Sequence, residues 1–83
     1  MRAADILPDH ANEGTFNGVS VRKGTVGAFI ANARVWVDPL TTANERIAAE
    51  NDLVDALPAL RALGLFDVLA IRDAGLQALV DSH

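Results

Sequence analysis

The chain has 83 residues, 51% of them hydrophobic, and it contains no cysteine. This length suits a single core, and the lack of cysteine excludes disulfides and thiolate metal sites. A net charge of −4 and an isoelectric point of about 4.8 argue against nucleic-acid binding, because neutralising phosphates needs a basic face. No apolar run approaches the roughly 20 residues of a membrane span, and the first ten residues lack the apolar centre of a secretory signal. We therefore expect a soluble, cytoplasmic protein with no membrane partner.

The first elements in the chain are an irregular arm and a hairpin. Residues 1–13 mix proline and asparagine with charges and show no sustained periodicity, which predicts a largely irregular N-terminal arm. A hairpin is predicted over residues 14–22, because Asn17-Gly18 can supply the positive φ angles of a two-residue turn between β-prone runs. In its second strand Val19 and Val21 point to one face, so this strand covers the core on one side only.

A helix is predicted over residues 25–37, with Thr25 as its N-cap. Its apolar positions follow the i, i+3, i+4, i+7, i+11 spacing of a core-facing stripe: Val26, Phe29, Ile30, Ala33 and Val37. Proline cannot continue a helix and also restricts the residue before it, so the helix ends before Asp38-Pro39. Trp36 lies at the edge of the stripe, a position typical of a core or interface residue.

The second half of the chain predicts two further helices and a strand. A helix over residues 43–63 begins with the capping box of Thr42 and Glu45 and ends at the left-handed cap of Gly64. Pro58 lies inside this span and predicts a kink or break. Residues 66–72 would place apolar side chains on both faces of an extended chain, which predicts a central strand. A last short helix is expected over residues 73–81.

Together these elements predict an α+β protein, a small two-layer sandwich in which helices cover a sheet of two or three short strands. Residues 1–83 then form one small domain. The open edges of so small a sheet and the positive mean hydropathy of +0.21 predict surplus apolar surface. We therefore expect a homo-oligomer, most simply a homodimer, or docking of a protein partner.

Reactive side chains are few and scattered. His10 and His83 lie in the arm and at the chain end, where a metal or acid/base site is poorly anchored. Carboxylate pairs such as Asp52 with Asp55 would need burial or a close like charge to act as general acids. We expect no enzyme, no metal site and no cofactor, and an enzyme that uses carboxylates or His10 is the less favoured alternative.

One local pattern indicates a binding site. Arg22, Lys23, Gly24 and Thr25 run from a strand into a helix start, where free amides and the helix dipole attract anions. The residue order departs from that of a phosphate loop, which requires lysine directly before threonine. Two interpretations stay open: a site for an anion or small ligand, and a solvated turn, which is favoured because exposed charges contribute little.

Two segments resemble a known pattern. Residues 57–68, LPALRALGLFDV, together with residues 21–26, VRKGTV, are similar to a pattern in a family of small uncharacterised bacterial proteins with no assigned function. The resemblance covers most of the chain after residue 15. It implies a stand-alone protein and transfers no activity, ligand or site residue.

The sequence therefore favours a non-catalytic module, regulatory in kind, that associates with itself or with a protein partner. The expected interface is the apolar surface around Trp36, Phe29 and Phe66. Binding of an anion or small ligand at Arg22–Thr25 is the alternative.

Overall fold

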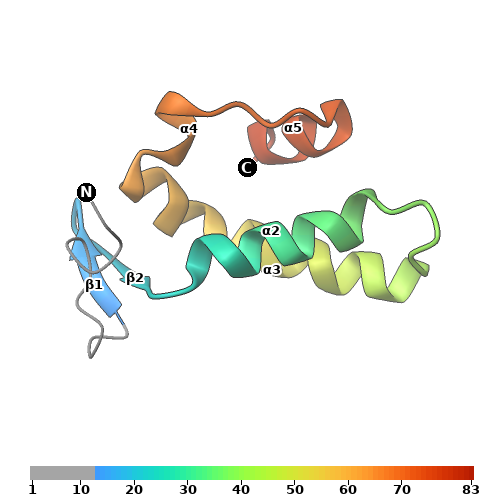
Figure 1. Cartoon of the computed structure of the whole chain (residues 1–83), viewed down its shortest axis with the longest axis horizontal. Helices are drawn as coiled ribbons and strands as arrows, with labels where there is room; N and C mark the ends of the chain where they lie inside the picture. The colour runs from blue at the N-terminus through green and yellow to red at the C-terminus, as the bar shows by residue number, and fades with distance from the viewer. Residues whose placement is uncertain (1–12) are drawn as a thin grey trace.

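The computed structural model describes residues 13–83. The elements follow in the order β1 (Glu13–Phe16), β2 (Val19–Arg22), α2 (Thr25–Val37), α3 (Ala43–Leu63), α4 (Leu65–Val68) and α5 (Ala74–Asp81). Helices α2 and α3 lie side by side, the hairpin sits at one end of this pair, and the segment α4–α5 runs along it (Figure 1). The predicted α+β class is confirmed. The predicted arm lies outside the described residues, apart from residue 13, which begins β1.

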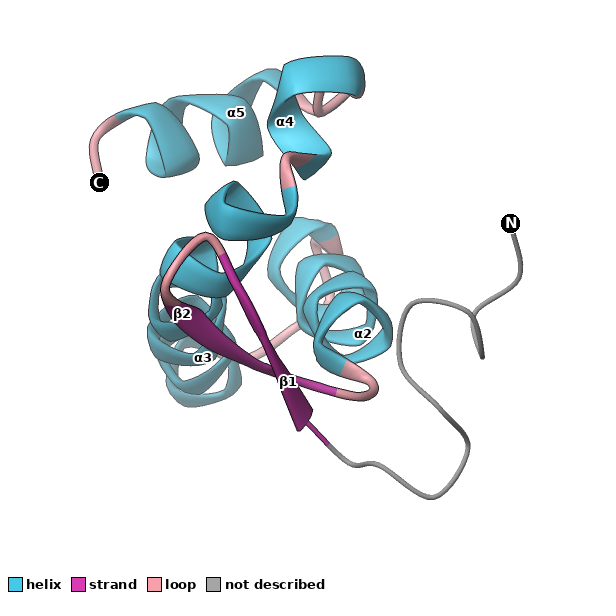
Figure 2. Ribbon diagram, turned by 90° about the vertical axis from the view of Figure 1, so that its left-hand side faces the viewer, coloured by secondary structure: helices cyan, strands magenta, loops and turns pink. Residues whose placement is uncertain are grey.

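The hairpin is the predicted one. Asn17 and Gly18 have φ angles of 48° and 80°, and Phe16 pairs with Val19 across the turn in an antiparallel register. Positive φ at both turn residues gives the twist that suits a two-residue hairpin. The Asn17 Nδ2 donates a hydrogen bond of 2.6 Å to the carbonyl oxygen of Ala62, so the turn is attached to the end of α3 (Figure 2).

Helix α2 has the predicted bounds but a different cap and a different buried face. Gly24, with φ of 91°, is the N-cap, whereas the Thr25 hydroxyl donates to the carbonyl oxygen of Arg22 over 2.7 Å. The predicted cap at Thr25 is therefore wrong. The buried residues of α2 are Phe29 and Trp36, while most of the predicted core stripe is exposed to solvent.

Helix α3 is continuous from Ala43 to Leu63, so of the kink or break predicted near Pro58 the structure excludes the break. Proline removes one backbone hydrogen bond at a cost of about 3 kcal/mol. On either side of it Leu57 and Leu60 are 2% and 0% exposed, and burying each leucine contributes about 1.5–3 kcal/mol, enough to hold the helix together. Both predicted caps of this helix are confirmed, since Thr42 accepts from the Glu45 amide and Gly64 adopts the left-handed conformation.

The strand predicted over residues 66–72 is wrong. Residues Leu65–Val68 form the short helix α4, and residues 69–73 are irregular up to the start of α5. A strand needs a neighbour for its backbone groups. Residues 66–72 do not join the described sheet, which consists of β1 and β2, and the amide of Ile71 instead donates to Gln77 Oε1 over 3.0 Å. The apolar pattern that predicted a buried strand does not reflect burial, because Val68 is 83% exposed and Leu69 is 58% exposed.

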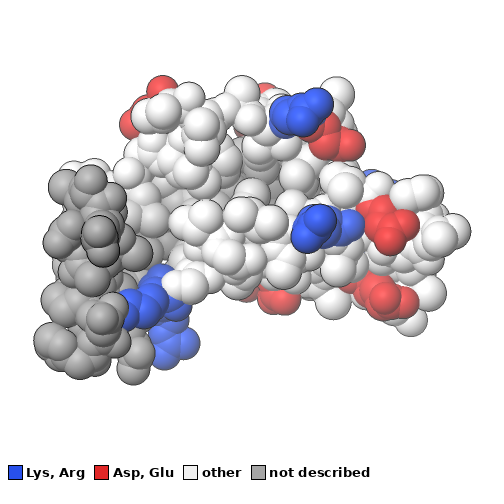
Figure 3. All heavy atoms as spheres, in the orientation of Figure 1, with Lys and Arg blue, Asp and Glu red and all other residues white. Residues whose placement is uncertain are grey.

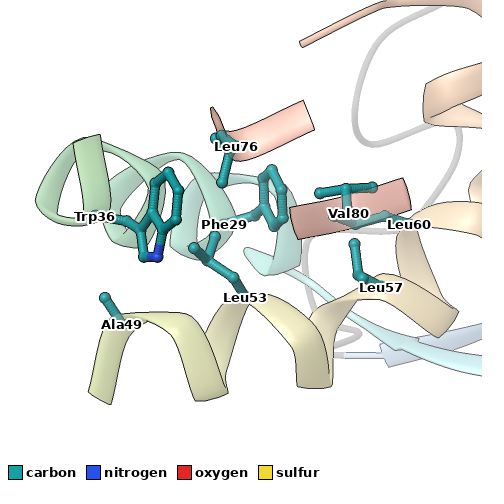
Figure 4. Packing of buried hydrophobic residues seen from close by; sticks show 8 residues of the cluster. All are labelled: Phe29, Trp36, Ala49, Leu53, Leu57, Leu60, Leu76 and Val80. Atoms are coloured by element: carbon teal, nitrogen blue, oxygen red, sulfur yellow. The ribbon is translucent and has the colours of Figure 1, made fainter. Parts of the chain in front are cut away.

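The core lies between helices. Its buried members come from α2, α3 and α5, and Figure 4 shows them facing one another: Phe29, Trp36, Ala49, Leu53, Leu57, Leu60, Leu76 and Val80. Among the described residues the sheet adds only Val21 to the buried hydrophobic set. The two-layer sandwich with a central strand is therefore replaced by a helical core that carries a hairpin at one end. Helix α5 is fixed by its predicted cap, where Asp73 Oδ1 accepts from the Leu76 amide at 2.8 Å.

Candidate functional site

The corner predicted to bind an anion is a tight turn in which Arg22, Lys23 and Thr25 have interaction partners within the chain. The Thr25 hydroxyl bonds back to the carbonyl oxygen of Arg22, and the N-cap Gly24 contributes no side chain. Arg22 and Lys23 both have interaction partners. The four predicted residues thus lie together in this corner, but they do not form a preorganised binding site for an anion.

A hollow of about 420 Å³ lies beside this corner. It is lined by Arg22 and Thr25 on one side and by Asp52 and Asp55 of α3 on the other. An anion in this hollow would face two carboxylates. Both aspartates are exposed, so neither has the buried environment that a carboxyl group needs to act as a general acid. The hollow therefore favours neither anion binding nor catalysis by a carboxylate pair.

The residues predicted to form an interface lie mostly inside the core. Trp36 is 8% exposed and Phe29 is 6% exposed. The indole Nε1 of Trp36 donates to Glu50 Oε1 over 3.0 Å, and the guanidinium carbon of Arg46 lies 4.2 Å from the ring centroid. Packing against α3 and α5 covers most of both rings, so Trp36 and Phe29 contribute little to the exposed surface.

Phe66 is half-buried and connects the core to the surface. Its ring meets the ring of Phe29 edge to face, with centroids 6.0 Å apart and an interplanar angle of 65°. This geometry is a preferred one for aromatic pairs. Phe66 also lines a surface hollow between α2 and α4. Of the three predicted interface residues, Phe66 is the one that is not buried, although the ring of Phe29 also lines this hollow.

Two adjoining hollows form a groove along α2, which we call the apolar groove. The first hollow measures about 200 Å³ and the second about 710 Å³. They share Phe29, Ile30 and Ile71. The first, at the N-terminal half of α2, is completed by Val26, Leu65, Phe66, Leu69 and Ala70. The second, at the C-terminal half, is completed by Ala33, Arg34, Val37, Arg72, Asp73 and Leu76. One wall is thus α2, and the other is the chain from α4 to the start of α5.

The apolar groove exposes side chains that the sequence pattern assigned to the core. Val26 is 37% exposed, Ile30 is 53% exposed and Val37 is 41% exposed. In Figure 3 uncharged residues fill most of the face between α2 and the segment α4–α5, and lysine or arginine atoms appear towards its margins. Helix α2 therefore has two apolar sides, one in the core and one in the groove.

The charges of the apolar groove lie at one end. Its charged lining residues are Arg34, Arg72 and Asp73, all in the larger hollow, whereas the smaller hollow has none. The Asp73 carboxylate caps α5, and neither arginine side chain makes a hydrogen bond or ion pair with another residue of the range 13–83. The groove thus has a net positive end on a chain whose overall charge is −4.

The apolar groove was not predicted from the sequence, because the apolar residues of α2 were assigned to a single, core-facing stripe. A signal was present, since the thirteen residues TVGAFIANARVWV contain one charged side chain and apolar residues on more than one side. A helix that is apolar around most of its circumference is normally buried on several sides. Here α3 and α5 cover one side and leave the other in water.

Residues 13–83 contain no group of three potential metal-ligating side chains. The candidate residue His10 lies outside the described range, and the carbonyl oxygen of His83 accepts a hydrogen bond from Arg61. None of the described helices combines the length and the apolar character needed to cross a bilayer. Comparisons with models of protein families, with curated proteins and with solved structures find no significant match for this chain.

Proposed function

We propose that this chain is a non-catalytic protein-interaction module that docks a helix of another polypeptide in the apolar groove. The observation that carries the proposal is the exposed apolar side of α2. Ile30 lies at the centre of the groove, where the two hollows meet, and is 53% exposed. Exposed apolar surface of this kind, rimmed by a few polar groups, is typical of interaction sites.

The shape of the groove supports a helix as the occupant. Exposed residues Val26, Ile30 and Val37 recur at helical spacing along one wall, and Leu69 stands on the other. A docked helix contacts such a groove through side chains at i, i+3 or i+4, and i+7. A small apolar ligand would leave much of its surface in water in an open groove, whereas small-molecule sites bury most of the ligand.

A matched pair of variants tests the proposal. Ile30→Gln places a polar amide in the groove, whereas Val35→Gln changes a residue of the same helix that is 37% exposed and does not line it. The probe is a synthetic amphipathic helix of about 18 residues with a leucine stripe at i, i+3, i+4 and i+7 and glutamine elsewhere. Binding is measured from amide chemical shifts of the ¹⁵N-labelled protein.

We expect shift changes at Ile30 and Ile71, and an affinity that falls about tenfold in Ile30→Gln and by less than about twofold in Val35→Gln. Sedimentation of the protein alone is measured in parallel, because a second copy is the other polypeptide that could fill the groove. A protein that stays monomeric and shows no peptide-induced shifts at the groove would refute the proposal.

A further inference from the structure

We infer that the occupant of the apolar groove is an amphipathic helix of a different protein, with acidic residues at one end of its apolar stripe. This inference rests on the proposed function and adds the chemistry and the orientation of the partner. It follows from the separation of charge along the groove, which has an uncharged end around Leu65 and Leu69 and a cationic end around Arg34 and Arg72.

The two arginines stand on opposite walls. Arg34 belongs to α2 and Arg72 to the residues just before α5, and both line the larger hollow. The carboxylate in the same hollow, that of Asp73, is engaged as the cap of α5. A docked helix at this end therefore lies between two guanidinium groups. Carboxylates pair with guanidinium in short, charge-assisted hydrogen bonds, whereas a lysine there would be repelled.

The uncharged end of the groove determines which end of the partner helix lies where. Its lining residues Val26, Leu65 and Leu69 offer neither charge nor polar side chains, so a carboxylate placed there would lose water without gaining a partner. The acidic residues of the partner must then sit over Arg34 and Arg72, and its most apolar turn must sit against Leu65 and Leu69. The charge pattern thus favours placing the acidic end of the partner helix at the cationic end of the groove over the opposite placement.

The same charges argue against a second copy of this chain as the occupant. In a two-fold symmetric dimer both partners use the same patch, so Arg34 and Arg72 would each occur twice in one interface. Asp73 would also occur twice and keeps its charge while it caps its own α5, but one aspartate does not balance the two arginines that each copy adds. Like charges that share an interface oppose association. An acidic helix from another protein meets no such repulsion.

The test compares three helical peptides with the same leucine stripe. One carries two glutamates near one end of the stripe, the second carries lysines at those positions, and the third carries glutamines. Each peptide is also made with the substituted pair at the opposite end, so that both chain directions of the docked helix are tested. Affinities for the full chain are measured by fluorescence anisotropy at low and at high salt.

We expect one of the two glutamate peptides to bind about three- to tenfold tighter than its lysine counterpart, with the difference shrinking at about 1 M salt. The double variant Arg34→Gln/Arg72→Gln is expected to remove the preference. The control Arg22→Gln/Lys23→Gln changes the net charge equally at residues outside the groove and is expected to retain it.

The outcomes distinguish the inferred preference for an acidic helix from the proposed docking function. Equal binding of the glutamate, lysine and glutamine peptides would overturn the inference about charge and leave the proposed function standing. A preference for glutamate that survives in Arg34→Gln/Arg72→Gln would also overturn it. A dimer in sedimentation that Ile30→Gln dissociates would replace the acidic partner by a second copy. Failure of all the peptides to bind, with no self-association, would refute the proposed function itself.

Discussion

Substitutions at two neighbouring residues of α2 test whether this helix has one apolar side in the core and another in water. Phe29 is 6% exposed and its ring packs edge to face on Phe66. Phe29→Ala removes that ring and leaves a cavity, at a cost of about 3–5 kcal/mol. A domain of this size is stable by only about 4–12 kcal/mol, so the milder Phe29→Leu, which keeps an apolar side chain at this position, is measured alongside it.

Ile30 follows directly in sequence but is 53% exposed. Full burial of an isoleucine contributes about 1.5–3 kcal/mol, so Ile30→Ala should lose only about half of that. Alanine also has the higher helix propensity, by a few tenths of a kcal/mol, which offsets part of the loss. We therefore expect Ile30→Ala to destabilise the protein by no more than about 1 kcal/mol.

The free energy of unfolding is measured by urea denaturation followed through tryptophan fluorescence. The chain has one tryptophan and no tyrosine, and Trp36 lies in the core, so its emission reports on the packing of interest. Far-UV circular dichroism confirms that helix is lost in the same transition. If Ile30→Ala destabilised a dilute sample as much as Phe29→Ala does, the assignment of the two sides of α2 would be incorrect.

Three further predictions concern the helix ends. Gly64→Ala is expected to lower the free energy of unfolding by about 1–2 kcal/mol, because φ at this residue is 82°. The control Gly27→Ala, inside α2 with open space around it, should raise the free energy of unfolding by about 0.4–1 kcal/mol, and equal effects of the two variants in thermal melts would contradict this. Thr42→Ala removes the side-chain cap of α3 and should cost about 1 kcal/mol in urea unfolding, while Thr42→Ser should cost much less. Arg61 donates to two carbonyl oxygens at the end of α5, so Arg61→Met should speed amide hydrogen exchange in α5 more than in α2, and uniform exchange rates would argue against this role.

Most of the local elements that short-range chemistry sets were predictable, and the cap of α2, predicted at Thr25 but found at Gly24, is the exception. The Asn17-Gly18 turn, the Thr42 cap and the Gly64 cap depend on residues within a few positions of one another, and the structure has all three. The same holds for the cap of α5 at Asp73. These features need only the conformational preferences of glycine and asparagine or a nearby side-chain oxygen.

Residues 66–72 show where local pattern was insufficient. Alternating apolar residues satisfy a strand and a loop equally well, and the choice depends on whether a neighbouring strand is free to pair. Here Gly64 turns the chain into α4 before this segment could lie along an edge of the hairpin, and the described sheet keeps two strands. The uninterrupted course of α3 past Pro58 has a similar origin, because the leucines that hold it are buried by contacts distant in sequence.

The amino-acid sequence by itself determined the class of the protein, the positions of its long helices and the lack of cysteine chemistry, because these follow from composition, periodicity and capping residues. Only the tertiary structure decided which side of α2 lies in the core. Helix α2 has apolar residues on more than one side, so periodicity alone cannot choose between them. Packing against α3 and α5 selects Phe29 and Trp36 for the core and leaves Val26, Ile30 and Val37 to line the apolar groove.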